Sequence, residues 1–126
     1  MTTAYVDTSV IVAIAFQEQG SVQIARRLED CTRWISSNLL EAELRATFAR
    51  EEQHLDPSTL SGIDWVLPDR SLSPEFAAAL RAGYLRGADL WHIATALYVA
   101  PKPGDIFFIT ADHRQREVAT SLGFQV

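Results

Sequence analysis

The chain contains a single cysteine, Cys31, so it can form no internal disulfide and cannot build a zinc cluster from thiolates. We expect Cys31 to be a buried apolar residue in a reducing compartment. Long hydrophobic runs are also missing: the longest, residues 10–16, is far below the roughly 20 residues that a membrane span needs. No basic segment of a signal peptide precedes it. We therefore expect a cytoplasmic protein that makes no use of a membrane.

Positive charge is scarce as well. Eleven basic residues stand against sixteen acidic ones, and the formal net charge is −5. Because nucleic-acid affinity comes largely from basic side chains that neutralise phosphates, this balance disfavours a broad basic groove. Two bound divalent cations would bring the charge from −5 to −1, and ten of the eleven basic residues are arginines, which suit bidentate phosphate contacts. A small, metal-bridged nucleic-acid site thus stays possible.

The length of 126 residues and the 48% hydrophobic content fit one domain, residues 1–126, with a core of its own. Short β-prone runs alternate with helical patterns along the chain. After the first strand, which ends at Val6, the predicted strands are 31–36, 63–67, 106–109 and 124–126. This alternation predicts an α/β fold with a mostly parallel sheet of four to five strands, whose C-terminal strand ends share one edge.

Asp7 stands where the first strand gives way to a helix. Tyr5 and Val6 are β-prone, and the apolar run that follows Thr8 and Ser9 is too long for a turn. Asp7 therefore belongs at the C-terminal edge of the sheet, where ligands collect in open α/β folds. The alternative is a simple helix cap, because Asp, Thr and Ser are all good N-cap residues.

Glu43 is the acid that the helical pattern turns inward. In a helix from 39 to about 53, Glu43 falls within the apolar arc, whereas Glu41 lies outside it and has Arg45 four residues on. The arc is defined by Leu40, Leu44, Thr47 and Phe48. An inward carboxylate needs a partner, since an unpaired buried charge costs several kcal/mol. That partner is either a bound cation or, alternatively, the basic group of a structural salt bridge.

Asp89 lies in the first turn of a helix predicted for residues 87–98. The helix dipole alone would favour a negative charge there, by roughly 0.3 to 1 kcal/mol. His92 is one turn further on and is expected to hydrogen-bond Asp89 as a structural histidine rather than as a metal ligand or base. Arg81 and Arg86 lie close by; we interpret them as solvated surface, with a phosphate contact as the alternative.

Asp112 repeats the position of Asp7, because it follows the buried strand 106–109 and begins a helix that Gly123 ends. With Gln115 three residues later it also fits a capping box, so a purely structural role is an equal alternative. If the two strands are neighbours, Asp7, Glu43, Asp89 and Asp112 converge. Clustered carboxylates repel one another unless cations intervene, and such hard oxygen ligands favour Mg²⁺ or Mn²⁺ over zinc.

Four segments in this order resemble the PIN-domain ribonucleases, particularly the VapC-type toxins of toxin–antitoxin pairs. They are Val6-Asp7-Thr8-Ser9, Ser36-Ser37 to Glu43-Leu44, Ala88-Asp89-Leu90-Trp91-His92-Ile93-Ala94-Thr95-Ala96, and Thr110-Ala111-Asp112 with Leu122-Gly123-Phe124. Each motif is loose alone, but together they span almost the whole chain. No motif of the resemblance falls on residues 55–73.

The resemblance implies a three-layer α/β/α PIN-like domain that cuts single-stranded or loop RNA with Mg²⁺ or Mn²⁺. Asp7, Glu43 and Asp89 would be the principal metal-binding acids, Asp112 would complete the site, and Ser9 or Thr110 would assist through a hydroxyl. A homodimer and a cognate antitoxin that fills the acidic pocket are implied partners. Bound metal ions would polarise the phosphate and activate a water for in-line attack.

Three other readings use similar patterns. A phosphoacceptor signalling domain needs its threonine before its lysine, but Thr110 follows Lys102. A haloacid-dehalogenase-type phosphatase needs a second aspartate where Ser9 stands. A non-catalytic PIN-like module that binds RNA or protein is the more serious alternative, and the presence of all four acids argues against it.

Overall fold

The computed structural model describes all 126 residues and contains a four-stranded, wholly parallel sheet in the order β3-β2-β1-β4. The strands are β1 (Thr3–Val6), β2 (Arg33–Ser37), β3 (Ile63–Val66) and β4 (Phe107–Ile109). The predicted last strand, 124–126, is reduced to one isolated bridge between Phe107 and Gln125. The order places β1 beside β4, so the C-terminal ends of these two strands lie side by side, which is the condition that the sequence analysis set for convergence of the four acids.

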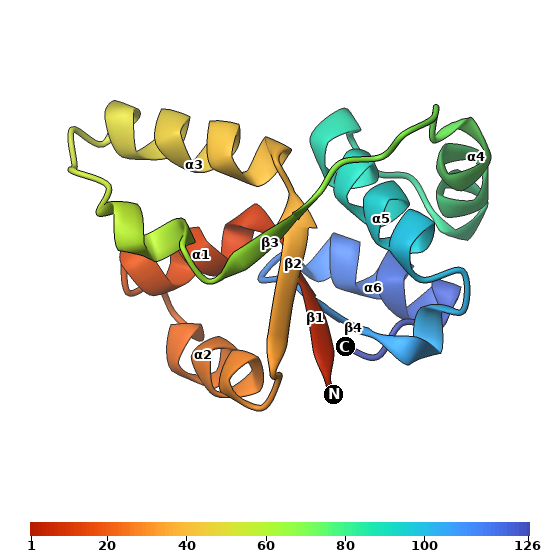
Figure 1. Ribbon diagram of the computed structural model, residues 1–126, viewed down its shortest axis with the longest axis horizontal. Coiled ribbons are helices and arrows are strands. Elements are labelled where there is room, and N and C mark those ends of the chain that lie inside the picture. The colour runs from red at the N-terminus through yellow and green to blue at the C-terminus, as the bar shows by residue number, and fades with distance from the viewer.

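Six α-helices cover the sheet. They are α1 (Thr8–Ala15), α2 (Ser21–Glu29), α3 (Leu39–Arg50), α4 (Ser73–Ala82), α5 (Gly87–Val99) and α6 (His113–Leu122). In Figure 1, α1 to α3 lie on one side of the sheet and α4 to α6 on the other, so the three-layer α/β/α arrangement is confirmed. Helix α3 ends about three residues before the predicted position. None of the helices is both long and apolar enough for a membrane span.

Alternation along β1 divides the interior into two apolar cores. Ala4 and Val6 pack with residues of α1, α2 and α3, whereas Tyr5 packs with residues of α4, α5 and α6. This is the two-residue period of a strand that is covered on both faces. The Tyr5 ring is fully buried and stacks on Phe108, with ring centroids 5.3 Å apart and planes 5° apart.

Local sequence explains where the elements around the sheet edge begin and end. Asp7 and Asp112 have extended backbones and accept hydrogen bonds from the first turns of α1 and α6, as N-caps do. Gly123, with φ of +100°, ends α6 in the left-handed conformation that glycine adopts without a steric penalty. Residues 55–73 contain the one-turn 3₁₀ helix η1 (Pro57–Leu60), capped by Asp56, and then β3.

Candidate active site

The neighbouring strands β1 and β4 bring Asp7 and Asp112 to the same edge of the sheet. Val6 is paired with Ile109, and the backbone N–H of Asp7 donates to the carbonyl of Ile109 at 3.0 Å. Both aspartates cap a helix, so the capping interpretation is correct for each of them. Capping and a place in a ligand site are compatible here, because each carboxylate also faces a common pocket.

That pocket, of about 270 Å³, lies at the C-terminal edge of the sheet between α3 and α5. All four predicted acids line it, together with Ser9. Its lining is Asp7, Thr8, Ser9, Val12, Glu18, Glu43, Thr47, Arg86, Asp89 and Asp112. Five carboxylates and one guanidinium therefore line this pocket, which is strongly acidic.

Asp7 is almost wholly buried, at 3% exposure, and is held by three donors, while the Thr110 hydroxyl also lies 3.3 Å from its Oδ2 and shares its hydrogen with Gln115. Ser9 donates twice to Oδ2, through its backbone N–H at 3.1 Å and its hydroxyl at 2.5 Å. The Nε2 amide of Gln115 donates to Oδ1 at 3.1 Å. The Ser9 and Thr110 contacts all lie on Oδ2, whereas Oδ1 accepts one hydrogen bond, so the second lone pair of Oδ1 remains for a ligand.

Glu43 turns inward from α3, as predicted, and makes no salt bridge with an arginine. Its Oε1 accepts from the Thr8 hydroxyl at 2.7 Å and lies 2.8 Å from Nε2 of His92. Burial acts to raise the pKa of Glu43, but the hydrogen bonds from His92 and Thr8 outweigh it, and the pKa is lowered. Glu41 instead pairs with Arg45 at 2.7 Å on the surface, also as predicted.

His92 is buried, at 1% exposure, and its partners differ from the expected one. It bonds Glu43 and not Asp89, because its ring points back toward β1. The Tyr5 hydroxyl accepts from the Ser37 backbone N–H at 3.1 Å and lies 2.8 Å from Nδ1 of His92. The phenolic hydrogen is thus available to Nδ1, which leaves the ring proton on Nε2, facing Glu43.

Asp89 is the acid whose ionisation the other predicted acids of the pocket oppose. Burial raises its pKa first, and the charges of Asp7, Asp112 and Glu43 raise it further, with only His92 acting in the opposite direction. Asp112 accepts from the Gln115 backbone N–H at 2.7 Å. An acid whose ionisation is opposed by three neighbouring acids sits where a cation would be most stabilising.

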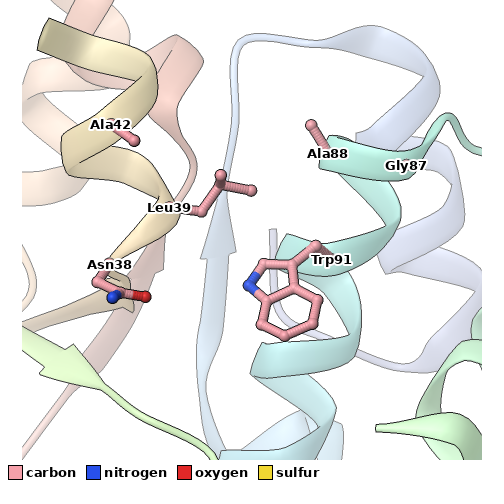
Figure 2. Close-up of a pocket in the computed structure, with 6 residues that line it drawn as sticks. All are labelled: Asn38, Leu39, Ala42, Gly87, Ala88 and Trp91. Atoms are coloured by element: carbon pink, nitrogen blue, oxygen red, sulfur yellow. The ribbon is translucent and has the colours of Figure 1, made fainter.

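A second pocket, of about 580 Å³, adjoins the acidic one and is mainly apolar. Leu39 of α3 and Trp91 of α5 point toward one another across it (Figure 2). Consecutive residues of α5 divide between the two: Ala88 lines the apolar pocket and Asp89 the acidic one. The larger pocket has no carboxylate in its lining, so the chemistry belongs to the smaller one.

Comparison with known proteins identifies the family to which the chain belongs. The family model described as "PIN domain" matches residues 4–121. The chain belongs to the PIN-domain family. It is 35% identical over 127 residues to Ribonuclease VapC35 of Mycobacterium tuberculosis, covering 97% of this chain and 93% of that protein. It is 31% identical to Ribonuclease VapC46 of the same organism, covering 100% and 97%. No solved structure matches at a comparable level of significance.

Several residues of this PIN domain's site were missed by sequence reasoning. Gln115 was interpreted only as part of a capping box, yet its side chain reaches Asp7 and is fully buried. Glu18 follows α1 in a turn, and Arg86 precedes α5; neither carries a pattern that would have indicated the pocket. For Thr8 there was a weak indication in the sequence, because a residue next to Asp7 is expected to lie near the same ligand site.

The donor set of the PIN domain fits a hard divalent cation. Its pocket offers carboxylate and hydroxyl oxygens, and no cysteine lines it. No three acidic, histidine or cysteine side chains lie close enough together to ligate one ion directly. Mg²⁺ usually keeps several waters and is bound through one or two carboxylates, so this spacing is compatible with Mg²⁺.

Proposed function

We propose that the chain is a metal-dependent endoribonuclease that hydrolyses phosphodiester bonds of single-stranded or loop RNA. The observation that carries the proposal is the convergence of Asp7, Glu43, Asp89 and Asp112 on one pocket, from four separate parts of the chain. Membership of the PIN-domain family and relatives named as ribonucleases support the same activity.

Asp7, Glu43, Asp89 and Asp112 are the proposed holders of Mg²⁺ or Mn²⁺, at most two of them directly and the others through bound water. A bound divalent cation supplies charge neutralisation at the phosphate and an activated water. The free lone pair of Asp7 and the raised pKa of Asp89 both favour a cation in this pocket. The hydroxyls of Ser9 and Thr110 assist by holding this part of the site in place. Ser9 bonds Asp7 directly, and Thr110 accepts from the backbone N–H of Asp112 at 3.0 Å.

Arg86 is the proposed contact for the RNA phosphate. It is the only basic side chain that lines the acidic pocket, and it makes no ion pair with any carboxylate. A guanidinium there offsets part of the repulsion that an RNA backbone would meet among five carboxylates. Arg81, by contrast, is exposed in the last turn of α4 and lines no described pocket.

We further propose that the protein acts in the cytoplasm as the toxin of a toxin–antitoxin pair, and that it forms a homodimer. The likeness to the VapC ribonucleases motivates both statements. The apolar pocket of Figure 2 supports a protein contact at α3 and α5, because covering exposed apolar surface is favourable in free energy.

The decisive experiment is cleavage of a labelled single-stranded RNA by the wild type, Asp7→Asn and Asp89→Asn, with Mn²⁺, Mg²⁺ or chelator. We expect metal-dependent cleavage by the wild type and a loss of at least about 100-fold in each variant, since each removes a charge at the metal. Asp64→Asn is the matched control, because Asp64 is an exposed aspartate paired with Arg33 on β2. Activity that survives in Asp7→Asn or Asp89→Asn would identify a contaminating nuclease or a different site.

A further inference from the structure

Gln115 connects more of the acidic site than any single acid does. Its side chain is fully buried, and every polar group on it is used. Nε2 donates to Oδ1 of Asp7 at 3.1 Å and to the backbone carbonyl of Asp89 at 3.3 Å, while Oε1 accepts from the Thr110 hydroxyl at 2.6 Å. Its backbone N–H donates to Asp112. One residue of α6 thus joins β1, β4 and α5 at the pocket.

We propose that Gln115 is a positioning residue that sets the mutual placement of Asp7, Asp89 and Asp112 for the cation. The inference rests on the proposed metal-dependent function. It concerns three of the four acids, because Glu43 is held separately by Thr8 and His92. Loss of a hydrogen bond that orients a metal-binding side chain typically costs 10- to 100-fold in metal affinity.

The amide has a chemical advantage over the other side chains of similar length at this place. A lysine or arginine would orient Asp7 but also neutralise it, and would then compete with the cation for the same carboxylate. A glutamate would add a further negative charge directly against Asp7. Glutamine orients the carboxylate, leaves its charge available, and directs the free lone pair of Oδ1 away from the bonded side.

The test is Mn²⁺ binding, followed by electron paramagnetic resonance of the free ion, for the wild type, Gln115→Met and Gln115→Asn. Methionine keeps the volume and removes both donors, whereas asparagine keeps the amide but is one methylene too short to bridge Asp7 and Thr110. We expect the Mn²⁺ dissociation constant to rise about 10- to 100-fold in both variants. If methionine prevents folding, the asparagine variant decides, because it leaves a polar group and room for water in a polar site.

Val118→Ala is the matched control. Val118 lies one turn further along α6, is buried at 2% and belongs to the apolar core outside the site. We expect it to lower the metal-free melting temperature but to leave the Mn²⁺ dissociation constant within about twofold of the wild type. A merely structural Gln115 would behave as Val118 does, and that result would overturn the proposal. Failure of the wild type to bind Mn²⁺ would instead overturn the metal-dependent function itself.

Discussion

Nε2 of His92 lies 2.8 Å from Oε1 of Glu43, across 49 residues of sequence, in a site that is closed to solvent on the histidine side. The other ring nitrogen, Nδ1, is hydrogen-bonded to the Tyr5 hydroxyl, which also accepts a hydrogen bond from the backbone N–H of Ser37. The orientation of Glu43 is therefore determined from inside the fold and not by a surface partner.

Substitution His92→Leu should lower both RNA cleavage and stability. Tyr5 would be left with an unused hydroxyl hydrogen and Glu43 with one donor, at a cost of about 1–3 kcal/mol in unfolding free energy. We expect kcat to fall roughly 10- to 100-fold, because a proposed metal-binding acid is no longer oriented. The control is His92→Gln, whose amide nitrogen can stand near the Nε2 position. Chemical denaturation and single-turnover cleavage measure the two effects, and unchanged kcat in His92→Leu would reduce His92 to a structural role.

The metal-free protein should lose stability as pH rises through the titration of Asp89. The folded-state pKa of Asp89 is raised, so between its ordinary and raised values the folded state holds more protons than the unfolded state, and a rise in pH destabilises it. Asp89→Asn removes this pH dependence of stability. Relative to the wild type, the melting temperature of the variant should therefore rise by a few degrees as pH increases across that interval. Thermal unfolding in chelator at a series of pH values measures the difference.

Glu43→Gln is the control for that experiment, because the change of stability with pH that Glu43 causes has the opposite sign to that of Asp89. The folded-state pKa of Glu43 is lowered, so the ionised carboxylate stabilises the fold above its ordinary pKa, and this contribution is lost on acidification through the lowered value. Its melting temperature should therefore fall further behind the wild type as pH rises. Parallel curves for both variants would contradict the described charge arrangement.

Removal of the Arg86 side chain should weaken RNA binding more than it slows the chemical step. We expect Arg86→Ala to raise KM for RNA about 10-fold, as loss of one charge-assisted phosphate contact does, with a small change in melting temperature. Arg81→Ala is the matched control, since Arg81 is equally basic and exposed but lies away from the pocket. Equal KM values for the two variants would remove Arg86 from the substrate site.

An arginine placed in the apolar pocket should separate the proposed dimer. Ala42 is exposed on α3 and lines that pocket, so Ala42→Arg puts a charge into the contact without disturbing the core. We expect light scattering at micromolar concentration to give a dimer for the wild type and a monomer for the variant. A monomeric wild type would contradict the homodimer, and a dimeric variant would place the contact elsewhere.

The four acids were predictable because each lies at a strand end, at the start of a helix, as Asp89 does, or on an inward helix face. Asp7 and Asp112 follow predicted strands, and the helical angle alone turns Glu43 inward. The partners of these acids were not predictable in the same way. Gln115 and His92 make their contacts with elements that are far apart in sequence. Local patterns explained Gln115 as part of a capping box and His92 as a partner of Asp89, so neither pattern indicated these contacts.

The stack of Tyr5 on Phe108 ties the shape of the interior to the chemistry at the sheet edge. The ring that fills the core on the α4 to α6 side ends in the hydroxyl on which His92 rests. A change in the thickness of that aromatic layer would be passed along two hydrogen bonds to the carboxylate of Glu43. The atoms that stabilise this part of the core therefore also orient a proposed metal-binding acid, and a core substitution that shifts the Tyr5 ring would disturb both.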